Sequence, residues 1–214
     1  MRGRRKIEVG LAIWAIGACF ALAASEPGEF VADATAAGAP PLDGEVWTVD
    51  AERFRARLAQ LDDAARRRFL TTRTGSGADP FLAPPRPGSP AFLTFLLQIE
   101  NLGPGDLYFQ PLLCPISTFQ GEMRNPLDLP SIQATYGMLD QEMPPAYTAV
   151  GKALFGDQAV LRPGESAAGL LVYRTADLKT RALRLEIRAT TSTGEVVGFK
   201  VPYRFAKKEE PSEP

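Results

Sequence analysis

The chain alternates between apolar and polar residues near its C-terminus. Two runs, 183–190 and 197–205, show this period of two, and the Thr193–Gly194 turn lies between them. Their apolar positions are Leu183, Leu185, Ile187, Ala189, Val197, Phe199, Val201, Tyr203 and Phe205. Because successive side chains of a strand point to opposite faces, each run predicts a strand with one buried face. Together the two runs predict a β-hairpin.

The same alternation marks the middle of the chain. Residues 93–99 alternate and end at a Gly/Pro-containing turn, after which a second strand is predicted over 107–116. Pro111 and Pro115 lack an amide donor, which places this second strand at a sheet edge or on a bulge.

A later turn joins two further strands. Arg162–Glu165 places Pro and Gly in the central positions of a type II turn, between predicted strands at 158–161 and 169–173. Roughly seven short strands without βαβ units predict a mostly β domain over 91–205, with two antiparallel sheets in a sandwich.

A helical spacing precedes these strands. After a short predicted strand over Glu45–Val49, Asp50 is a good N-cap, and apolar residues then recur every three or four positions. These residues are Phe54, Leu58, Leu61, Ala65 and Phe69. Asp62–Asp63 offers a second N-cap, so two short helices are the alternative within the segment 45–73. The other face is expected to be solvated and carries Arg53, Arg57, Arg66 and Arg67.

Two segments carry a resemblance to a known family. The strand Phe95–Asn101 reads Phe-Leu-Leu-Gln-Ile-Glu-Asn, and Leu161–Tyr173 begins Leu-Arg-Pro-Gly-Glu-Ser. They resemble the immunoglobulin-like domains of exported bacterial proteins and lipoproteins over about residues 91–205. The resemblance implies an immunoglobulin-like sandwich with a binding, scaffolding or envelope-assembly role, and it assigns no functional residue. We therefore expect such a sandwich with an N-terminal helical segment and a helical cap insertion.

The cap insertion is predicted at residues 119–156, where the strand pattern stops. A segment of this length is either functional or a small subdomain. Pro145–Phe155 predicts a short helix, with Pro at its start and Gly156 just past its end. The insertion contains all the methionines except the initiator, namely Met123, Met138 and Met143.

The insertion allows three interpretations. Its apolar residues form a plug over one end of the sandwich, or they form a partner surface, or the methionines hold Cu(I) together with Cys114. The partner-surface candidates are Tyr136, Met138, Met143 and Tyr147. No Met-x-x-Met cluster exists, so we expect no metal and no cofactor. Cys114 is instead expected in the core, on one strand face with Leu112 and Ile116.

The first thirty residues have the order of a bacterial export signal. Basic residues precede an apolar stretch, and Ala21–Ala23 supplies the small-x-small pattern of a cleavage site. This order predicts cleavage between Ala23 and Ala24, which removes residues 1–23 and leaves 24–44 as a flexible linker.

Two alternatives give this segment a membrane role. Ile16–Cys19 resembles the bacterial lipobox, which implies lipidation of Cys19 and a membrane-anchored lipoprotein. An uncleaved anchor is the other alternative, but the apolar stretch from Val9 to Ala24 has 16 residues, fewer than the about 20 that a spanning helix needs.

Charge and composition exclude several functions. Without residues 1–23 the chain keeps 20 basic and 24 acidic residues, a net charge of −4, which argues against a nucleic-acid partner. The chain has no histidine, which excludes Ser-His-Asp and Cys-His catalysis and His-ligated zinc.

These observations predict a periplasmic or secreted envelope protein, with lipidation at Cys19 as the only contact with a membrane. We expect a non-catalytic binding or structural module whose partner is an envelope protein or a glycan, followed by a charged tail at 206–214. The alternative is a carboxylate-dependent envelope hydrolase acting on carbohydrate or peptidoglycan, for which the sequence indicates no carboxylate pair.

Overall fold

The computed structural model describes residues 30–44, 46–51, 53–81, 92–138, 150–174 and 180–205. The strands are β1 (Phe30–Ala32), β2 (Leu42–Asp43), β3 (Val46–Asp50), β4 (Phe54–Gln60), β5 (Phe92–Asn101), β6 (Leu107–Phe109), β7 (Ile116–Thr118), β8 (Met123–Arg124), β9 (Ala159–Leu161), β10 (Ser166–Arg174), β11 (Ala182–Thr191) and β12 (Val196–Phe205). The helices are α2 (Asp63–Thr74), α3 (Leu129–Met138) and a 3₁₀ turn, Pro111–Leu113. The predicted export signal with Cys19, Ala23 and Ala24 lies outside the described residues, as does the tail.

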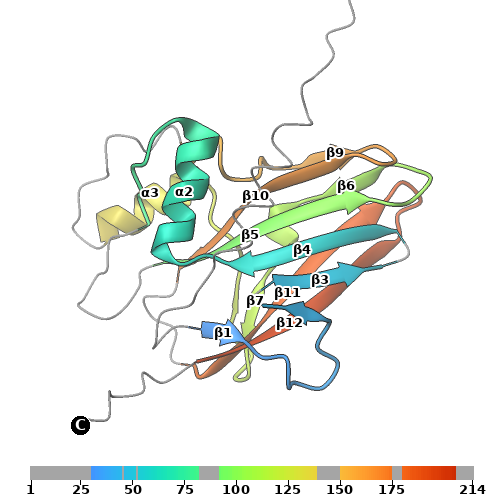
Figure 1. Ribbon diagram of the computed structural model, residues 1–214, viewed down its shortest axis with the longest axis horizontal. Helices are drawn as coiled ribbons and strands as arrows, with labels where there is room; N and C mark the ends of the chain where they lie inside the picture. The colour runs from blue at the N-terminus through green and yellow to red at the C-terminus, as the bar shows by residue number, and fades with distance from the viewer. Residues whose placement is uncertain are drawn as a thin grey trace, which may run out of the picture.

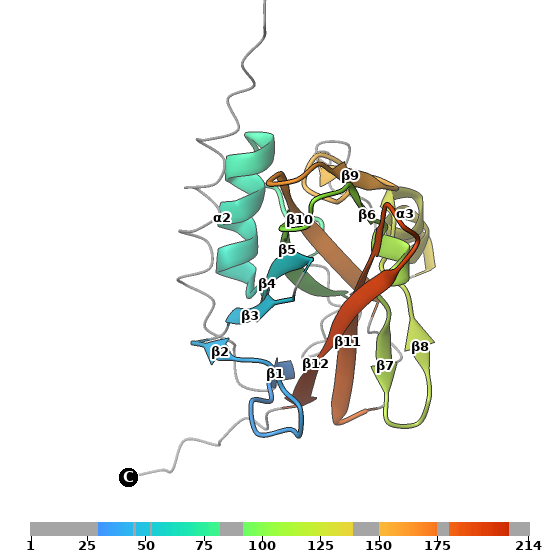
Figure 2. The same cartoon turned by 90° about the vertical axis from the view of Figure 1, so that its right-hand side faces the viewer.

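Two antiparallel sheets form the body of the protein. One has the order β1-β12-β11-β6-β9, with β7 pairing β11 and β8, and the other has the order β10-β5-β4-β3-β2. Figures 1 and 2 show the two sheets facing each other, with α2 and α3 at one end. The prediction of a mostly β fold with two antiparallel sheets is confirmed.

The main core lies between the two sheets. Phe95, Leu97 and Ile99 of β5 belong to one buried cluster with Leu185 and Ile187 of β11. Each of these side chains is completely buried. Complete burial of one such side chain stabilises a fold by about 1.5–3 kcal/mol. The period-two pattern of β5 and β11 thus has its cause in this shared core.

A second core covers the outer face of the sheet that contains β5. It joins Leu96 of β5 to Phe69 and Leu70 of α2 and to Ile132 and Tyr136 of α3. Because both faces of β5 are covered, the first six residues of this strand are all buried. Figure 2 shows α2 lying along the outer side of β3, β4 and β5.

The prediction of a helix after Asp50 is wrong, because Phe54–Gln60 forms strand β4. This segment pairs with β3 on one side and with β5 on the other, and Phe54 and Leu58 point into the main core. Ala56 is buried as well, so the segment also has the period of a strand. The alternative N-cap is confirmed, since Asp62 begins α2 and accepts a hydrogen bond of 2.6 Å from the Ala65 amide.

The strand predicted over 107–116 is broken in the middle. Strand β6 ends at Phe109, the 3₁₀ turn Pro111–Leu113 follows, and β7 starts at Ile116. The two prolines interrupt the ladder because they cannot donate to it. Cys114 is fully buried while Leu112 is 56% exposed, so the expected common face of these two residues is wrong.

The predicted hairpin and turn are confirmed. Leu185 pairs with Val201 and Ile187 with Phe199 across β11 and β12, and Gly194 in the turn has φ 83°. At the type II turn, Gly164 has φ 77° and the Glu165 amide donates to the Arg162 carbonyl at 2.9 Å. Both glycines occupy the left-handed region, which costs other residues strain.

The outer edge of β10 is covered by other segments. The Leu170 amide donates to the Ala153 carbonyl at 2.8 Å, and the Leu127 amide donates to the Val172 carbonyl at 2.7 Å. These bonds occupy backbone groups that a bare edge strand would leave open to aggregation. Within the described residues, no helix is long and apolar enough to span a membrane.

Candidate functional site

Of the two described residues of the predicted partner surface, one is buried and the other is exposed to solvent. Tyr136 is 1% exposed and belongs to the second core, whereas Met138 is 64% exposed. Burial, together with the charge of Asp79, raises the pKa of the Tyr136 phenol to about 12. Met143 and Tyr147 lie outside the described residues, as do the first five residues of the helix predicted over Pro145–Phe155. Tyr136 therefore cannot contact a partner at the surface of this conformation.

Cys114 and the described methionines do not meet at one point. Cys114 is buried in the main core, where burial raises its thiol pKa to about 12, so the thiol stays protonated. Met123 and Met138 are mostly exposed. No group of three His, Cys, Asp or Glu residues in the described part of the chain could hold a metal ion. The arrangement of these residues does not favour the Cu(I) interpretation.

A buried ion pair lies between α2 and β5. Nε of Arg66 donates to both carboxylate oxygens of Asp79, at 3.0 and 2.8 Å, and the two side chains are 4% and 0% exposed. Nη2 of Arg66 donates to Asp63 at 2.7 Å, and Nη1 lies 3.4 Å from Oγ1 of Thr94. We call these four residues the buried arginine cluster. The expectation that Arg66 lies on a solvated helix face is wrong, because the segment after α2 folds back over it.

The buried arginine cluster serves to hold the chain together. Asp79 also accepts a hydrogen bond of 3.0 Å from the Phe81 amide, and the Arg66 guanidinium lies 5.9 Å from the centre of the Phe81 ring. Burial raises the pKa of Asp79, and the nearby Arg66 charge opposes that rise. A carboxylate with a raised pKa is a candidate acid, but Asp79 is enclosed and fully paired.

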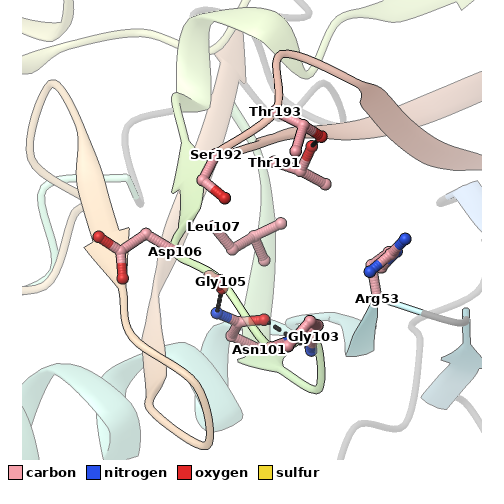
Figure 3. A pocket seen from close by; sticks show the side chains of 10 residues that line it. Arg53, Asn101, Gly103, Gly105, Asp106, Leu107, Thr191, Ser192 and Thr193 are labelled. Carbon is pink, nitrogen blue, oxygen red and sulfur yellow. Dashed lines mark hydrogen bonds between the residues drawn. The ribbon is translucent and has the colours of Figure 1, made fainter.

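A pocket of about 80 Å³ lies at the opposite end of β5, among the β3–β4, β5–β6 and β11–β12 turns (Figure 3). We call this hollow the turn pocket. Its lining residues are Arg53, Asn101, Gly103, Pro104, Gly105, Asp106, Leu107, Thr191, Ser192 and Thr193. It is smaller than the several hundred Å³ typical of pockets that enclose a whole drug-sized ligand. The turn pocket can therefore hold only part of a larger molecule.

Asn101 fixes the floor of the turn pocket. Its Nδ2 donates to the carbonyls of Gly105 at 2.7 Å and Leu161 at 2.8 Å, and its Oδ1 accepts from the Gly103 amide at 2.8 Å. The residue is 1% exposed. Each bond satisfies a group that would otherwise be costly to bury. Asn101 is therefore a structural residue that joins the β5–β6 turn to β9.

Backbone hydrogen bonds attach the other turns to this floor. The amides of Leu102 and Gly103 donate to the Arg53 carbonyl at 2.9 and 3.0 Å, and the Ser192 amide donates to the Asp106 carbonyl at 2.9 Å. A β-carbon at Gly105 would lie 2.4 Å from Oγ of Ser192, so only glycine permits the present position of that hydroxyl. Three separate turns thus form one fixed wall.

Three side chains of the turn pocket make no hydrogen bond or ion pair with any residue that the structure describes. They are the guanidinium of Arg53, the carboxylate of Asp106 and the hydroxyl of Ser192. The hydroxyls of Thr191 and Thr193 lie 2.8 Å apart and bond to each other. In Figure 3, Asp106 lies on the opposite side of Leu107 from Arg53. Sequence reasoning missed this site because turn residues carry no motif that predicts a common pocket.

Comparison with known proteins gives no family. No protein-family model and no curated protein matches the chain. Among solved structures, the yjhA protein from Bacillus subtilis is 12% identical, with 71% of this chain and 93% of that chain covered and a TM-score of 0.38. The putative ApaA protein from Bordetella pertussis is 10% identical, with 82% and 99% covered and a TM-score of 0.29. Likenesses this weak carry no argument about function.

Proposed function

We propose that this protein is an exported, non-catalytic binding module of the bacterial cell envelope. Its two sheets form an immunoglobulin-like sandwich that presents the turn pocket to an envelope protein or glycan. The N-terminal order of basic, apolar and small residues supports export. Anchoring through Cys19 is the route by which the protein would stay at a membrane.

The observation that carries the binding role is the set of unpaired polar groups in the turn pocket. Arg53, Asp106 and Ser192 are placed by three different turns, and hydrogen bonds of the backbone and of Asn101 hold those turns together. Binding residues placed by loops on a rigid sheet scaffold are a common way to build a recognition site. Such a site loses little conformational entropy in its backbone when a ligand binds.

A carboxylate-dependent hydrolase is the other class of function. It needs two carboxyl groups about 5–9.5 Å apart on either side of a bound sugar. The turn pocket holds one carboxylate, Asp106, and the enclosed Asp79 is paired with Arg66. No described feature favours hydrolysis over binding.

The export half of the proposal is tested by the mass of the protein made in its native cells. A chain that begins at Ala24, or one that begins with acylated Cys19, supports export. Recovery of the intact chain with Met1 from the cytoplasm contradicts it. Replacing Cys19 with Ala separates the routes, because only a lipoprotein loses its membrane association.

The binding half is tested by sedimentation with isolated cell envelopes. Purified protein is expected to pellet with envelopes and to release no soluble fragments from them. Absence of the protein from the pellet contradicts the binding role. Release of soluble sugar or peptide fragments supports the hydrolase instead.

A further inference from the structure

We propose that the turn pocket binds one sugar unit that carries a carboxylate group. This inference rests on the proposed binding function and adds the chemical class of the ligand. The chemistry is shared by free sugar acids and by acidic units within a glycan chain. The supporting features are one cation, several hydroxyls and a single acceptor carboxylate, all placed around a small open hollow.

Arg53 provides the position for the ligand carboxylate. Its side chain is exposed and forms no ion pair with any described residue, so the guanidinium keeps all its donors for a ligand. A planar guanidinium binds a carboxylate through two parallel hydrogen bonds, which are stronger than bonds between neutral groups. The backbone of Arg53 is fixed by its carbonyl, which accepts from the Leu102 and Gly103 amides.

The remaining polar groups suit the hydroxyls of a sugar ring. Ser192 can both donate and accept, and Asp106 is an acceptor that can receive hydrogen bonds from ligand hydroxyls. Leu107 and Pro104 are the apolar residues of the lining, and no aromatic side chain takes part. A pocket with this composition offers little to an apolar ligand.

The size and layout of the turn pocket distinguish a sugar from smaller ions. A volume of about 80 Å³ has room for several water molecules, which one face of a sugar ring would displace. Arg53 and Asp106 form no ion pair with each other and lie on opposite sides of Leu107 in Figure 3. The Asp106 carboxylate points away from Arg53 in Figure 3, so only a ligand longer than a single small ion could contact both.

The test compares small probes by NMR titration of the purified full chain. Glucuronic acid and N-acetylmuramic acid carry the carboxylate, while glucose and N-acetylglucosamine are their neutral counterparts. Acetate tests a carboxylate without a ring, and alanine tests a zwitterion. We expect the two sugar acids to shift the amide signals of residues 101–107 and 191–193, with a Kd on the order of 1 mM. We expect the neutral sugars, acetate and alanine to bind about tenfold more weakly or worse.

Variants assign the contacts. Arg53→Ala is expected to weaken binding of the sugar acids about tenfold to hundredfold, because it removes a charge-assisted pair. Gly105→Ala is expected to weaken it by displacing the Ser192 hydroxyl. Arg68→Ala is the matched control, since Arg68 is an exposed arginine on α2, and it should leave the Kd unchanged.

Several outcomes would overturn the inference. They are absence of shifts with the sugar acids, equal binding of acetate, alanine or the neutral sugars, and an unchanged Kd in Arg53→Ala. If wild-type protein still sediments with envelopes in those cases, the binding function stands and the ligand class alone is wrong. If sedimentation also fails, the proposed function fails with it.

Discussion

The two ends of β5 use polar side chains in opposite ways. At its start, Thr94 lies beside Arg66, whose charge is enclosed and paired with Asp79 and Asp63. At its end, Asn101 supports a pocket in which Arg53 and Asp106 have no partner among the described residues. A paired and buried arginine restricts how the chain can fold, whereas an exposed and unpaired one is available to a ligand. Under the proposed function, the open arginine at the turn end serves recognition, and the enclosed arginine at the helical end serves stability.

Loss of Arg66 should have the largest effect on stability. Arg66→Ala is expected to lower the free energy of unfolding by about 3–5 kcal/mol, because it leaves Asp79 buried without its cation. Urea denaturation measures this change. Arg68→Ala on the same helix is the control and should change the value by less than about 0.5 kcal/mol.

Replacement of both ion-pair partners sharpens this prediction. The double variant Arg66→Met, Asp79→Leu should lose less stability than Arg66→Ala alone, because it leaves no unpaired charge in the interior. If the stability loss of this double variant equals the summed losses of Arg66→Met and Asp79→Leu, the two groups do not interact. The buried arginine cluster would then not have the role assigned to it.

Loss of Asn101 should have the next largest effect. Asn101→Ala removes three hydrogen bonds and leaves the Gly103 amide and the Leu161 carbonyl without this partner. The free energy of unfolding should fall by about 1–3 kcal/mol. Asn125→Ala is the control because Asn125 is exposed. An unchanged stability in Asn101→Ala would mean that the turn end is not held by this side chain.

Loss of the hydroxyl from two buried tyrosines should change the stability by smaller amounts and in opposite directions. The Tyr136 hydroxyl has no hydrogen-bond partner in the described part of the chain, whereas the Tyr173 hydroxyl donates to the Cys114 carbonyl at 2.6 Å. Tyr136→Phe should raise the free energy of unfolding by up to about 1 kcal/mol, and Tyr173→Phe should lower it by about 1 kcal/mol. Thermal unfolding of both variants checks the signs. A loss in Tyr136→Phe would indicate that a buried water bonds to that hydroxyl.

Loss of Arg53 should have the smallest effect on folding. Its guanidinium has no described partner, so Arg53→Ala should change the free energy of unfolding by less than about 0.5 kcal/mol. The same variant should lose binding of the sugar acids. A large loss of stability in Arg53→Ala would remove the contrast between the two ends of β5.

The sequence predicted the strands whose burial pattern is simple. The hairpin β11–β12 was predictable because Leu185, Ile187 and Val201 face one core at every second position. Strand β4 was not predictable, because Phe54, Leu58 and Leu61 also fit the spacing of a helix. Its state was decided by pairing with β3 on one side and β5 on the other, and pairing with a segment as distant as β5 is not encoded in a local pattern.

The candidate site could be predicted even less well. The turn at Asn101–Gly105 was recognisable from its glycines, but nothing in the sequence connected it with Arg53 or with Ser192. Those residues are 48 and 91 positions away from Asn101. The sequence analysis placed the partner surface in the Met-rich insertion instead, because methionine and tyrosine are typical of adaptable surfaces. Burial of Tyr136 in the second core shows that the same residue types also fill an interior.

By itself, the sequence determined the class of the fold and the positions along the chain of most of the longer strands. It did so because alternation of apolar residues and the backbone needs of Gly164 and Gly194 are local properties. The tertiary structure alone decided which arginine is enclosed and which is free. Arg66 and Arg53 have the same side chain, and only the segments that fold over one and leave the other open make one structural and the other a candidate for binding.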